Sequence, residues 1–156
     1  MYRAYHKRAF LRAILVRPGL LAASAASCLL LIASAGAAHA ASVEVRVGGV
    51  VGNSGKVNVA VCDQEHFLKD CAHSGSAPAQ AGTTVVTVDN VPAGTWAVLA
   101  YQDDNSNDKL DRNLLGIPSE NYGFSRAARG KFGPPGFADA ALEIRDDKVV
   151  VPVTLK

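Results

Sequence analysis

Apolar and polar residues alternate along most of the chain after residue 42, in short segments bounded by glycine, proline and polar turn residues. Alternation at every second residue is typical of strands that bury one face. Valines follow this pattern on both sides of the glycine-rich stretch 48–55, which predicts a β-hairpin. Because no long helical pattern occurs, we expect an all-β fold, a β-sandwich of about six or seven strands. The expected strands cover residues 43–47, 57–61, 83–91, 95–101, 140–145 and 149–155.

One connection is much longer than the others. Residues 102–137 combine large apolar residues with many glycines and prolines. Connections of this length are usually functional or disordered, and the apolar content disfavours disorder. We therefore expect one long ordered loop with buried apolar side chains, which either caps one end of the sandwich or forms a ligand-binding surface. These side chains are Leu114, Leu115, Ile117, Tyr122, Phe124, Phe132 and Phe137.

The first forty residues have the features of a secretory signal peptide. Basic residues precede the apolar run 20–38, and small residues flank a cleavage point between Ala40 and Ala41. An uncleaved membrane anchor is the alternative, because the run approaches the roughly twenty residues that a spanning helix needs. Its many small residues favour cleavage. We expect a signal peptide at 1–40, a single β-sandwich domain at 41–156, and a periplasmic or secreted protein with no membrane span after cleavage.

Cleavage reverses the sign of the net charge. The whole chain carries a formal charge of +2, whereas residues 41–156 contain eleven Lys and Arg against fourteen Asp and Glu, which gives −3. The basic excess therefore belongs to the targeting segment, and no face of the mature chain is basic enough to indicate nucleic-acid binding. We expect an exported or cell-envelope ligand, which the residues do not identify.

Two cysteines remain after cleavage, Cys62 and Cys71. An even number of cysteines in an exported chain favours a disulfide, and on the chain-entropy model a bridge across so short a loop is worth about 2.5–3 kcal/mol. The neighbouring His66 and His73 offer an alternative, a transition-metal site of two sulfurs and two imidazoles. The spacing lacks the paired CxxC motif of zinc sites, so the disulfide is preferred.

An Asx-rich stretch follows the apolar strand expected at 95–101. Asp103, Asn105, Asn107 and Asp111 place oxygen-bearing side chains at alternate positions, as a loop that curls around calcium requires. The sixth position of an EF-hand loop would be glycine and the twelfth glutamate, but the chain has Asp108 and Leu114 there, so calcium affinity should be weak. The alternative is a turn in which the same side chains bind local backbone amides.

The mature chain offers little for catalysis. Its imidazoles, His66 and His73, both lie in the cysteine segment, and acid pairs such as Asp103 with Glu120 follow no catalytic pattern. No phosphate-binding glycine loop or dinucleotide fingerprint occurs. We therefore expect a noncatalytic exported binding or structural module of unknown ligand. A metal-dependent or hydrolytic periplasmic enzyme is the alternative.

Two segments, VPAGTWAVLAYQDDNSNDKLDRNLLGIPSENYGFS and ARGKFGPPGFADAALEI, carry a family resemblance. Together they resemble the secreted bacterial family catalogued as domain of unknown function 2141, and the similarity extends from Val43 to Leu155. The resemblance implies an exported immunoglobulin-like sandwich, similar to transthyretin-like modules that carry a turn like Pro92–Gly94. It implies no activity. Family members tend to carry glycine where this chain has Ser106 and Asp108.

Overall fold

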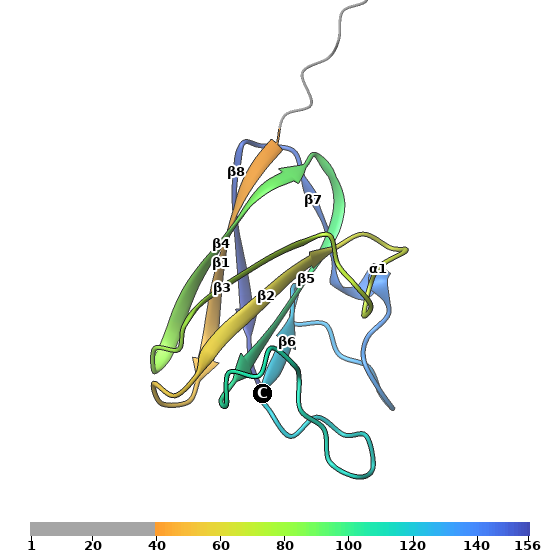
Figure 1. Cartoon of the computed structure of the whole chain (residues 1–156). Helices are drawn as coiled ribbons and strands as arrows, with labels where there is room; N and C mark the ends of the chain where they lie inside the picture. Colours follow the sequence, from red (N-terminus) through yellow and green to blue (C-terminus); the bar gives the residue numbers. More distant parts are fainter. Residues whose placement is uncertain (1–39) are drawn as a thin grey trace, which may run out of the picture. The chain divides into compact units, whose positions relative to one another are not determined.

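The computed structural model describes residues 40–156, and this part of the chain forms two β-sheets packed face to face (Figure 1). The predicted signal peptide lies outside the described residues except for Ala40. Among residues 40–156, no helix has the length and apolar character needed to cross a bilayer. The all-β sandwich is confirmed, with eight strands in this part rather than six or seven. The elements are β1 (Ala40–Val50), β2 (Lys56–Cys62), β3 (His73–Pro78), β4 (Gly82–Pro92), β5 (Gly94–Asp103), β6 (Tyr122–Phe124), α1 (Phe137–Ala140), β7 (Ala141–Ile144) and β8 (Lys148–Thr154).

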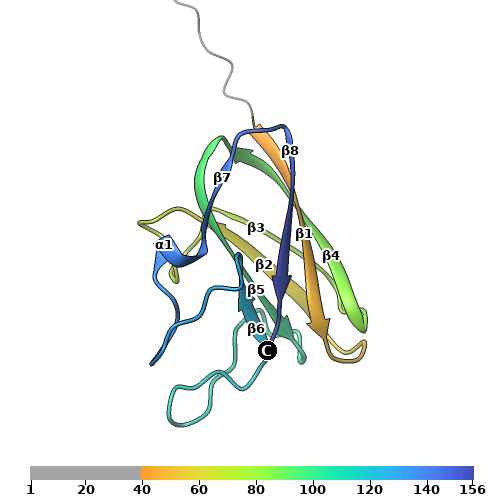
Figure 2. The same cartoon turned by 180° about the vertical axis from the view of Figure 1, so that it is seen from behind.

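The two sheets differ in size. In the three-stranded sheet, the central strand β1 is antiparallel to β4 and parallel to β8. In the five-stranded sheet, β2 lies between β3 and β5, and β6 and β7 pair with successive parts of β5. Figure 2 shows the same arrangement from behind, with β8 beside β1.

The space between the sheets is filled mainly by valine. Each central strand buries alternate residues there, and β-branched side chains fit this pleated surface well. Burying one such side chain is worth about 1.5–3 kcal/mol. The other face of the five-stranded sheet points away from this core and carries a separate apolar cluster. The buried valines of β1 and β2 are Val43, Val45, Val47, Val50, Val57, Val59 and Val61.

The hairpin predicted for the valine-rich segments is wrong. β1 and β2 lie in different sheets, and residues 51–55 cross between them. Either arrangement buries one face of each strand, so alternation does not distinguish pairing within a sheet from packing between sheets. The buried Gln102 side chain holds this crossing, because it donates to the Val51 carbonyl at 2.7 Å and accepts from the Val51 amide at 2.9 Å. Gly55 is required there, since a Cβ would lie 1.9 Å from the Asp103 carbonyl oxygen.

Two strands were not predicted from the sequence. β3 consists of small and polar residues of low β propensity, and it forms by pairing with β2. β6 is only three residues long and lies within the long connection. Gly123 lets β6 approach β8, because a Cβ there would lie 2.4 Å from the Thr154 carbonyl oxygen. The Tyr122 and Lys156 backbones exchange hydrogen bonds of 3.3 and 3.0 Å across this contact.

The long connection divides into a packed part and an exposed part. Phe124 is buried, and Tyr122 and Phe137 are half-buried beside it. The predicted burial is wrong for the other four large apolar residues, because they lie on turns that extend past the sheet instead of over it (Figure 1). These exposed residues are Leu114, Leu115, Ile117 and Phe132.

Candidate binding surface and acidic loop

The outer face of the five-stranded sheet, which points away from the valine core, carries its own apolar cluster. Strand register places Leu99 of β5 between Ala60 of β2 and Phe124 of β6. One step along, Tyr101 of β5 lies opposite Tyr122 of β6, whose ring meets that of Phe124 edge-on at 5.9 Å. These side chains form a continuous apolar floor on the outer face.

A groove of about 640 Å³ lies over this floor. Leu99 and Tyr101 line its base, and its walls come from two segments of the long connection, 110–118 and 130–134. Figure 1 shows both segments on the side of the sandwich that carries β6 and α1. A second hollow of about 480 Å³ continues over β2 and β3 and shares this base. The groove is therefore concave, largely apolar and built on a rigid sheet, as small-molecule sites usually are.

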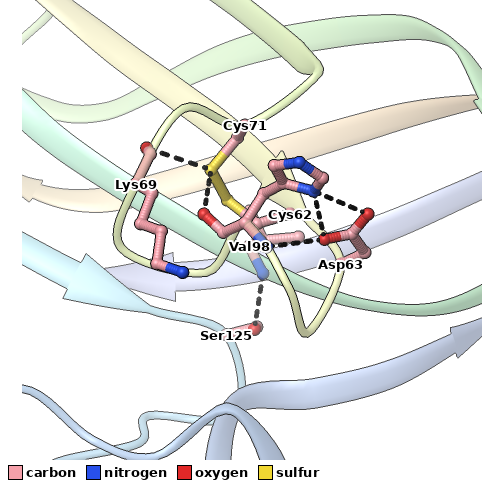
Figure 3. Close-up of a disulfide and its surroundings, with 7 residues drawn as sticks. Cys62, Asp63, Lys69, Cys71, Val98 and Ser125 are labelled. Carbon is pink, nitrogen blue, oxygen red and sulfur yellow. Dashed lines mark hydrogen bonds and ion pairs between the residues drawn. A yellow bond between two sulfur atoms is a disulfide. The ribbon is translucent and has the colours of Figure 1, made fainter.

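The disulfide positions a third wall of the groove. Cys62, at the end of β2, is joined to Cys71 with their Cα atoms 4.9 Å apart (Figure 3), which confirms the predicted pairing. The bridged segment forms turns, in which Phe67 packs against Phe124 at 6.1 Å and against Phe137 at 5.7 Å between ring centroids. The next residue, Leu68, is partly exposed and lines the groove.

The disulfide disfavours the alternative transition-metal site, since its two sulfurs are bonded to each other and neither is a thiolate. The two histidines have other partners. His66 contacts the Asp63 carboxylate through Nδ1 at 2.8 Å. The pKa of Asp63 is lowered mainly by the hydrogen bond from the His66 backbone amide and next by this contact with the His66 ring. His73 stacks edge-on against Trp96, with ring centroids 5.2 Å apart. Within residues 40–156, no group of three His, Cys, Asp or Glu residues is arranged to hold a metal ion.

Asp103 is the centre of the acidic loop, residues 103–111. Its side chain is fully buried, and its two carboxylate oxygens accept the backbone amides of Asn107 at 2.9 Å and Asp108 at 2.8 Å. The Asn58 amide donates to the same carboxylate at 3.2 Å, and the Lys56 ammonium lies 3.9 Å away. The negative charge is therefore compensated by protein groups.

The other three candidate calcium ligands meet one another. Asn105 and Asn107 both donate from Nδ2 to the Asp111 carboxylate, at 2.7 Å and 3.1 Å. Their amide oxygens instead accept backbone amides, of Asn107 at 3.1 Å and of Lys109 at 2.8 Å. These contacts are the ones expected of an Asx-rich turn, because the amide oxygens accept backbone amides and the amide nitrogens donate to the Asp111 carboxylate.

Glu120 holds the acidic loop together, although from the sequence it is a candidate only as one of a pair of catalytic acids. Its carboxylate accepts the amide of Asp104 at 3.0 Å through one oxygen and that of Asp111 at 2.9 Å through the other. It therefore ties both ends of the acidic loop together and is itself buried. The sequence offers one sign of this role, because Glu120 is the one acid between Asp111 and Asp139 in a segment otherwise rich in apolar residues and glycine.

Two non-glycine residues of the acidic loop adopt left-handed backbone angles. Ser106 has φ of 58° and Asp108 has φ of 63°, a region that glycine enters without a steric penalty. The Asp108 carboxylate accepts a hydrogen bond from the Lys56 ammonium, which offsets the steric penalty of this backbone angle. The same hydrogen bond raises the pKa of Lys56. On the adjoining floor, burial is the largest cause that raises the pKa of Tyr101, and the nearby carboxylates of Asp103 and Asp108 add to it.

Comparison with known proteins gives a family match. Residues 45–151 match the model of a family described as an uncharacterized protein conserved in bacteria, domain of unknown function 2141. The matched range contains most of the sandwich core, the acidic loop and both segments that wall the groove. No curated protein and no solved structure matches the chain.

Proposed function

Because the chain belongs to the domain of unknown function 2141 family, whose members are described as uncharacterized, we propose its function from the surface alone: it is a noncatalytic exported binding module. The groove on the outer face is its binding site. The observation that carries this proposal is the combination of a cavity of about 640 Å³ with apolar walls left open to solvent. Contiguous exposed apolar surface of this kind usually marks an interaction site.

The side chains that an enzyme would use are occupied in structural roles. Asp103 is sealed from solvent, and both oxygens of Glu120 accept backbone amides, so this acid pair does not face the groove as a free acid and base. Both cysteines form the disulfide, which leaves no thiolate nucleophile in the mature chain. These contacts favour binding over the alternative of a metal-dependent or hydrolytic enzyme.

The acidic loop supports the groove from one side. Leu110 lies at its end and lines the groove, and Glu120 and Asp111 fix the start of the following segment. A weak calcium site in this loop would require Asn105 and Asn107 to rotate their amides and lose their present hydrogen bonds. We therefore assign the loop a structural role, in which its side chains close the turn themselves.

A fluorescent apolar probe tests the groove. We expect 1-anilinonaphthalene-8-sulfonate to bind the purified protein saturably, and Leu99→Asp to abolish this binding, because it places on the floor a negative charge that repels the sulfonate. Ile117→Asp is a second variant, because Ile117 is an exposed wall residue whose substitution spares the core. Val85→Asp is the matched control, since Val85 is an exposed apolar residue of the other sheet. Absence of saturable binding, or an equal loss in the control, would contradict the proposal.

A further inference from the structure

Two turns of the long connection present fully exposed apolar side chains, here called the apolar tips. The first is the Leu114–Leu115 pair, whose side chains are 106% and 83% exposed, and the second is Phe132, which is 103% exposed. Both turns project on the same side of the sandwich, beside β6 and α1, in both views (Figures 1 and 2). Neither tip packs on the domain, so folding does not account for these residues.

The first tip is held by a well-defined turn. The Gly116 amide donates to the Asn113 carbonyl at 2.9 Å, which makes Leu114 and Leu115 the two central residues of a β-turn. The Asn113 side chain accepts the amides of Leu115 at 3.0 Å and Ile117 at 3.1 Å, and Arg112 pairs with Pro118 at the base. Central turn positions normally carry Gly, Pro, Asn, Asp or Ser. Two leucines there have no local structural reason and point to a partner.

The segment that carries the tips has a net charge opposite in sign to that of the rest of residues 41–156. Residues 112–138 contain four basic residues and one acid, Glu120, which is buried and bound to backbone amides. The remainder of residues 41–156 contains seven basic residues and thirteen acids. Arg129 and Lys131 shortly precede Phe132 in sequence, and Arg112 lies at the base of the leucine turn. The segment that carries the apolar tips is therefore basic, whereas the acidic loop before it and the rest of residues 41–156 are acidic overall.

We propose that the apolar tips insert into an anionic lipid bilayer, with the surrounding basic residues held against its lipid headgroups. This inference rests on the proposed binding function and names the partner of that surface. Exposed apolar side chains on two turns at the rim of the groove suit a bilayer, which accepts such side chains in any arrangement, whereas a protein partner would need a matching surface for each. Interfacial binding of this type gains from both buried apolar area and attraction to anionic lipid.

Two other occupants fit the surface less well. A second copy of the chain in a two-fold contact centred on the tips would bring the same basic residues, Arg129 and Lys131, against their own copies, and the like charges would repel. An acidic protein would satisfy the charge, but it offers no reason for leucine and phenylalanine at solvent-facing tips on two separate turns. The bilayer accounts for both the apolar and the basic residues.

Vesicle sedimentation tests the inference. Protein recovered from the periplasm or medium, with its mass measured so that all variants share one N-terminus, is mixed with vesicles of phosphatidylcholine alone or with 30% phosphatidylglycerol. We expect binding to the anionic vesicles that weakens as salt is raised. Leu114→Ser with Leu115→Ser, and Phe132→Ser alone, should each lower the affinity at least tenfold. Arg129→Gln with Lys131→Gln should lower it roughly 25-fold, because one basic residue near an anionic surface is worth roughly fivefold.

The controls separate this inference from the binding proposal itself. Val85→Ser with Val150→Ser removes exposed apolar side chains from the three-stranded sheet and should leave vesicle binding unchanged. Wild-type protein that ignores anionic vesicles, or tip variants that bind like wild type, would overturn the bilayer. If the groove still takes up 1-anilinonaphthalene-8-sulfonate in that case, the binding function stands without a membrane partner. A dimer in sedimentation that Phe132→Ser dissolves would assign the tips to a second copy instead.

Discussion

The Asp103 side chain shows how one residue sets the conformation of the acidic loop. A carboxylate removed from water is costly unless hydrogen bonds and opposite charge replace the lost solvation. Asp103 receives the amides of Asn107 and Asp108, the side-chain amide of Asn58, and the field of Lys56. Its carboxylate oxygens accept backbone amides that the turn would otherwise leave without acceptors. The carboxylate therefore stabilises the turn, and the turn stabilises the buried carboxylate.

Asp103→Ala should therefore destabilise the protein markedly. The substitution strands two backbone amides and the Asn58 amide, and hydrogen bonds to a charged group contribute about 1.5–3 kcal/mol each. Urea unfolding followed by circular dichroism measures the change. Asp104→Ala is the matched control, because Asp104 is exposed on the same loop and its substitution should cost less than 0.5 kcal/mol. Equal stability of the two variants would show that the hydrogen bonds to Asp103 are dispensable.

The same contacts predict how the loop responds to calcium. A ligand that binds only the folded state raises the melting temperature by mass action, whereas a loop closed by its own hydrogen bonds responds to ionic strength alone. Because Asn105 and Asn107 donate to Asp111, we expect equal melting temperatures in chelator, millimolar calcium and sodium of matched ionic strength. A rise specific to calcium that disappears in Asn107→Ala would instead establish the calcium site.

At the scale of elements, the sequence identified strands wherever burial of one face required alternation. Six of the strands were predicted in this way, because the valine periodicity follows directly from packing on one face. The disulfide was predicted from the even number of cysteines in a chain expected to be exported. β3 was missed because its residues contribute little burial and its pairing depends on β2, a partner distant in sequence. The groove was likewise accessible only in part, since it needs β5, β6 and two turns to come together.

Two phenylalanines of the long connection differ in burial, because Phe124 is packed and Phe132 is exposed. Phe124 is buried against Phe67 and Tyr122, and truncating a packed phenylalanine costs about 3–5 kcal/mol. Phe124→Ala should therefore lower the free energy of unfolding by an amount of that order. Phe132→Ala should change it by less than 0.5 kcal/mol, because the ring has no packing to lose. Similar denaturant midpoints for the two variants would contradict the division into a packed and an exposed part.

The disulfide connects stability to the groove wall. Cys62 and Cys71 close a loop with a sequence separation of 9, for which the chain-entropy estimate is about 2.7 kcal/mol. Thiol titration of the unfolded, unreduced protein should find none of these two sulfurs free. Cys62→Ser with Cys71→Ser should lower stability by about that amount and loosen the segment that carries Phe67 and Leu68. Two titratable thiols in the native material would contradict the bridge.

At the scale of the whole domain, the candidate surface and the start of β1 lie at opposite ends. Ala40 pairs with Pro92 at one end of the three-stranded sheet, whereas the acidic loop and the apolar tips lie toward the other (Figure 1). Inward valines hold the two sheets together, and the residues that could contact a partner come from the turns on the outer face.

This arrangement makes cleavage after Ala40 compatible with both the fold and the proposed surface. Removing residues 1–40 leaves β1 from Ala41 onward, and Ala41 still pairs with Val91 and keeps its side chain buried. An oxidising compartment also suits the disulfide. We expect the intact mass of protein recovered from the periplasm or medium to correspond to residues 41–156 with the disulfide formed. A recovered species that retains residues 1–40 would instead establish the uncleaved anchor, and membrane attachment would then come from the end of the domain opposite the apolar tips.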